Sequence, residues 1–359
     1  MDSTDKLLGK WRHSLPQTVH LDIVHQFQKL ILDIFGFIAF DYDLNTLDDD
    51  GHKNTSNNDL ARALQDILNL AQKIIRFPDV IIIFYLKLNI KYRRARAIVE
   101  QYCNRIIAHE LAQSPESIAQ RKRTSLIASL ICSLQQDEQA EVNATEDKKK
   151  GLSRSELFDE MLFFLIVGFE SVSSALSWFI YHMSKHPQVQ QKIKVELMDG
   201  NDYKRPLSLD RLDSLVYLDA VINEVLRFTP ISDGTFRTLI VDDRLPESGV
   251  QLYKGEQVYI SIHNLAQDPQ NWSIDPNVFY PERFLEGGKP LHPYAFVPFG
   301  SGHRQCIGQD LARFEFKVIA ARLMQYVTFH DGGPQVNTGG QVQTITIMPK
   351  HIGVSITFD

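Results

Sequence analysis

The sequence is short of cysteine, of positive charge and of long apolar runs. Its three cysteines, Cys103, Cys132 and Cys306, cannot form a disulfide framework and are not paired at Cys-x-x-Cys spacing, which favours a reducing compartment. The net charge of −6 argues against a nucleic-acid-binding protein, because such proteins normally carry a basic surface. No apolar run reaches the roughly 18–20 residues that span a bilayer, and the polar N-terminus has no signal-peptide pattern. The sequence therefore predicts neither a transmembrane segment nor a signal peptide of its own.

Helical periodicity is what the sequence has in abundance. A capping box, Ser153-x-x-Glu156, precedes the longest apolar segment, and the charged stretch 135–151 before it predicts a surface linker. Towards the C-terminus, apolar and polar residues alternate in short segments that are separated by turn residues, which predicts short strands. The expected helices are 24–40, 60–75, 91–111, 153–184, a segment ending near 198, 214–228 and 309–326, and the expected strands are 235–241, 257–262, 344–347 and 353–358. The predicted fold class is mainly α with a small β region, in a single domain over 1–359.

The segment 299–308, Phe-Gly-Ser-Gly-His-Arg-Gln-Cys-Ile-Gly, is the most informative part of the chain. Its glycines allow a tight turn and a close approach to another surface. Cys306 lies just before an expected helix, whose N-terminal partial positive charge favours a thiolate. A thiolate in such a loop is a suitable axial ligand for haem iron, and Arg304 is placed to pair with a haem propionate. The alternative is a buried structural cysteine beside a glycine-rich turn.

This segment resembles the cysteine loop of the cytochromes P-450, F-x-x-G-x-R-x-C-x-G, at every fixed position. The resemblance implies a P-450 fold with a long central helix, a helical bundle and a small β region. It also implies haem b, with the Cys306 thiolate as the axial ligand of the iron. Further cofactor contacts implied within the loop come from Phe299, Gly300, Gly302, Arg304 and Gly308. Cys103 and Cys132 lie in helical patterns and are expected to be ordinary packing residues.

A second constellation is Glu224-x-x-Arg227, whose spacing places both side chains on one helix face. Such pairs are usually solvated surface contacts. Here, however, the pair resembles the family's E-x-x-R motif, which joins an arginine of a downstream P-E-R-F segment, supplied by Arg283. The resemblance implies a buried network of Glu224, Arg227 and Arg283 that braces the cysteine loop. Its expected role is structural.

Gly168-Phe169-Glu170-Ser171 interrupts the apolar helix with an acid and an alcohol. Buried polar groups are costly unless they are partnered or functional. By resemblance, Gly168 leaves room for dioxygen, and Glu170 and Ser171 relay protons towards it. The family pattern A-G-x-[DE]-T is broken by Val167 and by Ser171, which keeps the hydroxyl but lacks the restraining methyl. The alternative is a helix kink with an exposed glutamate.

Arg237 is a further candidate, because relatives place a propionate-binding basic residue in this strand. The alternative is a surface arginine on an edge strand. Trp11-Arg12 superficially resembles another propionate-binding pair, but its position suggests the following helix, so it is not assigned to haem.

The implied activity is insertion of one oxygen atom from O₂ into a small apolar organic substrate. Electrons would come from NADPH through a reductase, with cytochrome b5 as an optional second donor. The segment 32–36 resembles a helix that lies well inside complete relatives, so we expect the N-terminal portion of the family domain to be missing. Two alternatives stay open: a truncated, non-catalytic haem-binding fragment or pseudoenzyme, and haem used for isomerase or peroxygenase chemistry.

Resemblance to eukaryotic microsomal members implies the endoplasmic reticulum membrane as the location. The apolar segment 77–88 is followed by basic residues and can rest on a membrane surface, or it can belong to the core.

Overall fold

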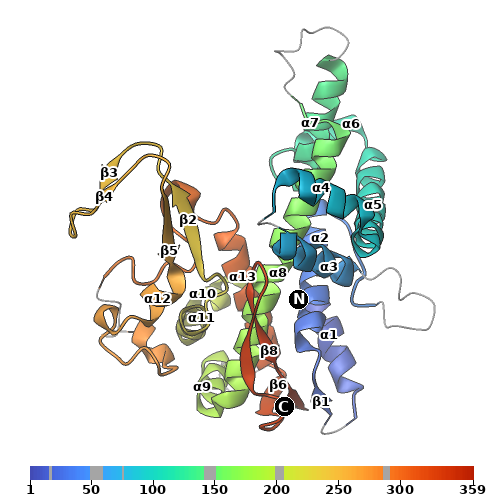
Figure 1. The fold of residues 1–359 in the computed structure, drawn as a ribbon. Coiled ribbons are helices and arrows are strands. Elements are labelled where there is room, and N and C mark those ends of the chain that lie inside the picture. The colour runs from blue at the N-terminus through green and yellow to red at the C-terminus, as the bar shows by residue number, and fades with distance from the viewer. Residues whose placement is uncertain (16–17, 49–59, 75–76, 141–150, 199–205, 286–291) are drawn as a thin grey trace. The chain divides into compact units, whose positions relative to one another are not determined.

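The computed structural model describes residues 1–15, 18–48, 60–74, 77–140, 151–198, 206–285 and 292–359 (Figure 1). The chain divides into two compact units, and the division falls inside one long helix, between Ser173 and Ser174. Unit 1 comprises residues 1, 14–21 and 174–359, and unit 2 comprises residues 2–13 and 22–173. The expectation of a single domain over 1–359 stays a prediction, and each unit is described separately below.

Unit 2 is helical. Its helices are α1 (Asp2–Arg12), α2 (Ile23–Phe40), α3 (Leu60–Ile74), α4 (Asp79–Leu88), α5 (Ile90–Leu111), α6 (Pro115–Arg121), α7 (Leu126–Ala140) and the first part of α8 (Arg154–Lys185). α2 buries an apolar face that includes Phe27, Ile31 and Phe35, and α3 packs along α5. The helices expected at 24–40, 60–75 and 91–111 are thereby confirmed within one residue at each end.

The capping box that opens α8 forms as the sequence predicts. The backbone N–H of Ser153 donates to Glu156 Oε2 at 2.9 Å, and the N–H of Glu156 donates to Ser153 Oγ at 3.3 Å. These contacts satisfy N–H groups that the first turn of a helix leaves without intrahelical partners. Ser153 and Glu156 therefore fix the point at which the long helix begins.

Unit 1 combines the second part of α8 with further helices and four small antiparallel sheets. Its helices are α9 (Pro187–Leu197), α10 (Leu209–Ser214), α11 (Val216–Phe228), α12 (Ile262–Gln267) and α13 (Gln309–Met324), with 3₁₀ turns η2 (Pro269–Asn271), η3 (Pro281–Phe284) and η4 (Gly302–Arg304). The sheets pair β1 (Val19–His20) with β9 (Val354–Phe358) and β9 with β6 (Val327–Asp331), β2 (Gly234–Thr238) with β5 (Gln257–Ser261), β3 (Asp243–Arg244) with β4 (Gln251–Leu252), and β7 (Gly339–Gln343) with β8 (Ile347–His351). The mainly helical fold class with a small β region is confirmed.

Several boundaries differ from the prediction. The strand expected at 344–347 is wrong: residues 344–346 form a turn in which the Thr344 N–H donates to the Thr346 carbonyl at 2.8 Å, between β7 and β8. The expected linker 135–151 begins later, because α7 continues to Ala140; residues 141–150 lie outside the described part of the chain. The helix expected at 214–228 begins two residues later, at Val216, after the separate α10.

Two helices among the described residues are long and apolar enough to cross a membrane by length and composition, although polar residues interrupt the apolar sequence of each. They are α2 and α8, whose apolar windows are 61% and 67% buried within the structure. Buried core helices of water-soluble proteins meet the same criterion, so the finding does not by itself place either helix in a bilayer.

Candidate functional site: the cysteine loop and its supports

The cysteine loop, residues 299–308, is closed by its own backbone. Gly300 and Gly302 adopt positive φ angles of 73° and 68°, which side-chain-bearing residues rarely adopt. The chain then turns through η4, and the N–H of Cys306 donates to the carbonyl of Phe299 at 2.9 Å. This bond ties the cysteine back to the first residue of the loop, so the position of Phe299 sets the position of Cys306.

Cys306 presents a free, exposed thiol two residues before the cap of α13. Gly308 caps that helix, and its carbonyl accepts the N–H of Ala312 at 2.8 Å. A Cβ added to Gly308 would lie 4.0 Å from the Cys306 sulfur, at ordinary van der Waals distance, so this glycine lies directly beside the sulfur. The next side chain, Ile307, is 98% exposed. An exposed sulfur at a helix N-terminus, flanked by a glycine and an apolar side chain, fits a soft thiolate donor beneath an apolar macrocycle.

The two candidate propionate-binding arginines have different surroundings. Arg304 ends η4, is exposed, and makes no ion pair within the described part of the chain. Arg237 lies on β2, where its Nη1 donates to Thr235 Oγ1 at 2.7 Å and to the Phe236 carbonyl at 2.8 Å. Among the residues that the structure describes, no carboxylate forms an ion pair with either guanidinium, so both suit an anionic partner.

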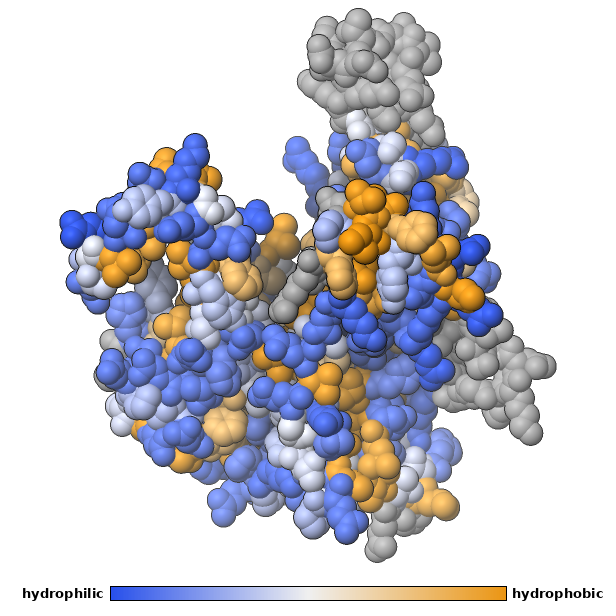
Figure 2. Space-filling view, in the orientation of Figure 1, coloured by the Kyte–Doolittle hydropathy of each residue, from blue (hydrophilic) through white to orange (hydrophobic). Residues whose placement is uncertain are grey.

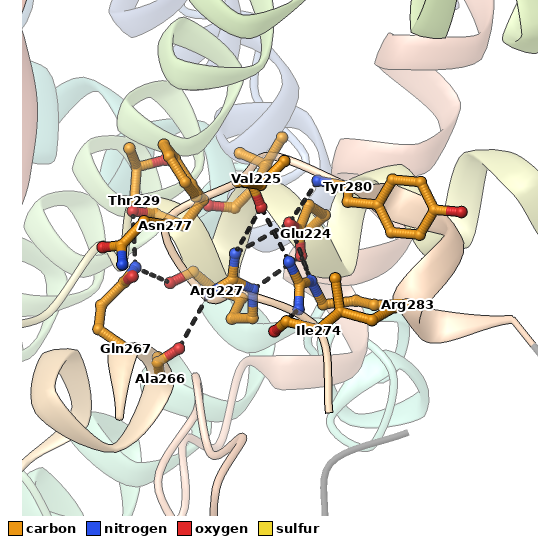
Figure 3. A network of polar contacts seen from close by, with 12 residues as sticks. Glu224, Val225, Arg227, Thr229, Ala266, Gln267, Ile274, Asn277, Tyr280 and Arg283 are labelled. Atoms are coloured by element: carbon orange, nitrogen blue, oxygen red, sulfur yellow. Dashed lines mark hydrogen bonds and ion pairs between the residues drawn. The ribbon is translucent and has the colours of Figure 1, made fainter. Parts of the chain in front are cut away.

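Glu224, Arg227 and Arg283 form a buried network in unit 1, shown in Figure 3. Glu224 accepts from Arg227 Nε at 2.8 Å and from Arg283 Nε at 3.1 Å, and all three side chains are fully buried. The Tyr280 N–H adds a third donor at 2.7 Å. The sequence-based expectation brought together three residues from α11 and η3 that the structure indeed places around one carboxylate.

The arginines of this network also hold irregular backbone. Arg227 Nη1 donates to the Ala266 carbonyl at 2.9 Å, and Arg283 donates to the carbonyls of Ile274, Asp275 and Val278 at 2.8–3.0 Å. Burial lowers the pKa of Arg283, an effect that Glu224 opposes and Arg227 reinforces. Because these carbonyls have no sheet or helix partner, the network substitutes for regular secondary structure in the segment that leads towards the cysteine loop.

Gly168, Glu170 and Ser171 belong to unit 2. A Cβ on Gly168 would lie 2.6 Å from the ring of Phe35, so this glycine permits close packing of α8 on α2. Glu170 is 2% exposed, which rules out the alternative of a solvated glutamate. Ser171 Oγ donates back to the Val167 carbonyl at 3.2 Å. The proposed oxygen and proton roles of these residues stay predictions.

Sequence analysis missed a residue that contacts the loop. Arg313, in the second turn of α13, places its guanidinium carbon 5.0 Å from the centroid of the Phe299 ring, and its Nη1 donates to Asn223 Oδ1 of α11 at 2.9 Å. Burial lowers the pKa of Arg313, while Asp219 and Asp310 raise it. The only signal in the sequence was an arginine one to two turns into the helix after the cysteine, which is too common to single out.

Comparison with known proteins gives one family and consistent relatives. The model of the family described as Cytochrome P450 matches residues 1–355. Cytochrome P450 3A11 of Mus musculus is 36% identical over 190 residues, which cover 52% of this chain and 37% of that protein. Cytochrome P450 3A5 of Homo sapiens is 36% identical over 183 residues, or 51% of this chain and 36% of that protein. The aligned part of the chain thus spans a little over a third of the length of these curated relatives.

A solved structure agrees over the whole chain. The structure titled "Retinoic acid bound cyanobacterial CYP120A1" superposes with a TM-score of 0.76 and 27% identity. The match covers 100% of this chain and 73% of that one. The arrangement of helices and small sheets described above is therefore shared with that protein.

Proposed function

The chain belongs to the cytochrome P450 family, and on this premise we propose that it binds haem b through the Cys306 thiolate and acts as a monooxygenase. The observation that carries the proposal is the exposed Cys306 thiol in a loop closed onto Phe299 at the N-terminus of α13. Haem bound there would supply the activation of O₂, for which a thiolate ligand donates electron density. The substrate class is a small apolar organic molecule, and the products would be its oxygenated form and water.

The residues of the cysteine loop, together with Arg237 of β2, have different roles in the proposed haem binding. Cys306 supplies the metal ligand, and Arg304 and Arg237 supply positive charge for the two propionates. Gly300, Gly302 and Gly308 keep side chains away from the face that approaches the cofactor. Phe299 begins the loop and accepts the N–H of Cys306 at 2.9 Å, so it fixes the backbone that carries the sulfur.

The proton-handling residues lie on α8. In this proposal dioxygen lies beside the backbone of Gly168, away from the Phe35 ring, Ser171 Oγ passes a proton towards it, and Glu170 holds the proton that Ser171 receives. Glu170 is 2% exposed, which keeps the carboxyl that would hold the proton away from bulk water. Serine in place of the family's threonine keeps the hydroxyl but gives it more rotational freedom.

Electrons would come from NADPH through a reductase, with cytochrome b5 as an optional second donor. The location that fits such partners is the endoplasmic reticulum membrane, in line with the mammalian 3A relatives. The structural neighbour carries retinoic acid, a long apolar molecule with one carboxylate, which supports an apolar substrate.

The first test is a carbon monoxide difference spectrum of the haem-reconstituted, reduced chain. Thiolate ligation predicts a Soret band at about 450 nm in the parent chain, and we expect Cys306→Ala to lack that band. Cys132→Ala serves as the matched control, because it removes a cysteine outside the loop. A band near 450 nm in Cys306→Ala, or its absence from the parent chain, would overturn the proposal.

A second candidate is a haem-binding protein without catalytic activity. It is favoured by the short stretch of the curated relatives that the chain matches, 37% of the mouse protein. Turnover with a reductase and NADPH distinguishes the two. A chain that shows the 450 nm band but oxidises no member of an apolar substrate panel, and consumes no substrate-dependent NADPH, is the non-catalytic form.

Helix α4 supports a membrane location more specifically. Val80, Phe84 and Leu88 are 79%, 65% and 63% exposed, so the alternative that 77–88 belongs to the core is wrong. Apolar side chains gather over α4 on the face shown in Figure 2, and exposed Lys87 lies in its last turn. Lys91, in the first turn of α5, is exposed and pairs with Asp66 at 2.8 Å. We propose that this helix rests on an anionic lipid surface.

Vesicle flotation tests this contact. We expect the chain to bind vesicles of phosphatidylcholine with phosphatidylserine, and Phe84→Asp to weaken binding about tenfold because a charge would enter the apolar layer. Ile240→Asp is the matched control, since Ile240 is also an exposed apolar residue, at 81% against 65% for Phe84, but lies in unit 1. Equal loss in both variants, or no loss in Phe84→Asp, would contradict the role of α4.

A further inference from the structure

We propose that Arg313 is a positioning residue for Cys306, acting through the ring and carbonyl of Phe299. The inference rests on the proposed function, in which Cys306 ligates haem iron. All the residues concerned belong to unit 1, and the contacts run from α11 to α13 and then to both ends of the cysteine loop.

The first step is the contact between Arg313 and Phe299. The guanidinium carbon lies 5.0 Å from the ring centroid, within the range of a cation–π interaction. Arg313 is partly buried, so the contact is less weakened by water than one on the surface. Its Nη1 is anchored by Asn223 Oδ1 at 2.9 Å, which leaves the guanidinium little freedom to leave the ring.

The second step leads from Phe299 to the sulfur. The Phe299 carbonyl accepts the N–H of Cys306 at 2.9 Å, and the intervening residues include Gly300 and Gly302, whose backbone is intrinsically permissive. A loop with two glycines does not fix its own ends. The contact of Arg313 with the Phe299 ring, called the clamp below, therefore restrains Phe299 where the flexible backbone of the loop does not. Through the hydrogen bond between Phe299 and Cys306, the clamp also holds the backbone of Cys306 in one position.

The third step connects the clamp to the buried network. Asn223 precedes Glu224 on α11, so neighbouring residues hold Arg313 on one side and Arg227 with Arg283 on the other. A further pair, Lys317 Nζ to Asp219 Oδ2 at 2.7 Å, joins α13 to α11 one turn along. α11 thus positions the cysteine loop in two ways. Asn223 acts through Arg313 of α13, which follows the loop, and Glu224 acts through the buried network in the segment that precedes the loop.

Hydrogen exchange of the Cys306 amide tests the proposal without requiring haem. In Arg313→Gln we expect the Cys306 N–H to exchange at least about tenfold faster, because local opening of the Phe299 bond is no longer opposed by the clamp. Arg313→Lys keeps a cation near the ring and should restore part of the protection. Arg322→Gln is the matched control: Arg322 lies on the same helix as Arg313, and its guanidinium carbon lies 4.5 Å from the centroid of the Tyr326 ring, which follows the end of that helix.

Two results would overturn the inference: unchanged exchange at Cys306 in Arg313→Gln, or an equal increase in Arg322→Gln. If Arg313→Gln does not fold, Asn223→Ala removes only the anchor, and we expect about threefold faster exchange. No increase in that variant would also overturn the inference. These readings stand whether or not the chain takes up haem, so they are independent of the carbon monoxide test.

Discussion

At the scale of single residues, we expect the buried carboxylate of Glu224 to contribute more to the stability of the fold than an exposed ion pair does. It is fully buried and faces two guanidiniums and one backbone N–H. Ions are expensive to bury, and the expense is offset only while each charge keeps its partners. The network therefore holds the backbone around Tyr280 in place only as a complete set.

We predict that Glu224→Gln lowers the free energy of unfolding by about 3–5 kcal/mol, because both arginines would be left buried without a counter-charge. Urea unfolding followed by circular dichroism measures it. Glu100→Gln is the control: Glu100 pairs with Arg96 at 2.7 Å on the surface of α5, and its loss should cost less than about 0.5 kcal/mol. Similar losses in the two variants would show that burial of the network contributes little.

At the scale of elements, local hydrogen bonds determine one part of α8 and tertiary packing determines another. Its start is determined locally by the reciprocal bonds of Ser153 and Glu156. Its middle is determined by packing, since Gly168 lets the Phe35 ring of α2 lie where any Cβ would stand. The first feature can be predicted from four residues, whereas the second requires knowing that the two helices touch.

We predict that Ser153→Ala destabilises unit 2 by about 1 kcal/mol, because the Glu156 N–H would lose its cap. The measurement is the urea midpoint of the chain. Ser114 caps α6 in the same way, accepting from the Ser117 N–H at 3.2 Å, so Ser114→Ala is a matched control for a short helix. A much smaller effect for Ser153 than for Ser114 would mean that packing, and not the cap, holds the start of α8.

The same division explains which elements the sequence could predict. The long helices follow from hydrophobic spacing, whereas the cysteine loop and the members of the Glu224 network follow from the resemblance of their motifs to those of the cytochromes P-450. β7 was missed because Gly339 and Gly340, both with positive φ, read as turn residues, although Gly339 lies against Tyr181. α1 was also missed, although Leu7, Leu8 and Trp11 are buried along one face. The contact of Arg313 with Phe299 depends on tertiary packing and left no pattern.

At the scale of the whole molecule, two buried groups set opposite dependences of stability on pH. Burial lowers the pKa of His182 to about 3, with a smaller contribution from His186. Burial raises the pKa of Glu315, 4% exposed on α13, to about 7. Neither group can take its charged form in the folded chain without losing hydration.

The signs follow from which state binds the proton first. For His182 the folded pKa lies below the unfolded value of 6.5, so the unfolded chain protonates first and stability falls as pH drops from 6.5 towards 3. For Glu315 the folded pKa lies above the unfolded value of 4.5, so the folded chain protonates first and stability falls as pH rises from 4.5 towards 7. The two dependences oppose each other between pH 4.5 and 6.5.

We therefore predict that Glu315→Gln raises the free energy of unfolding at pH 8 by about 1–3 kcal/mol and has a much smaller effect at pH 4, since one pKa unit corresponds to about 1.4 kcal/mol. His182→Gln should flatten the loss of stability between pH 6 and pH 4, even though it also removes the stacking of His182 on Phe279. Urea titrations of the parent and both variants at pH 4, 6 and 8 measure these slopes. Parallel curves for all three proteins would mean that neither Glu315 nor His182 governs the dependence of stability on pH.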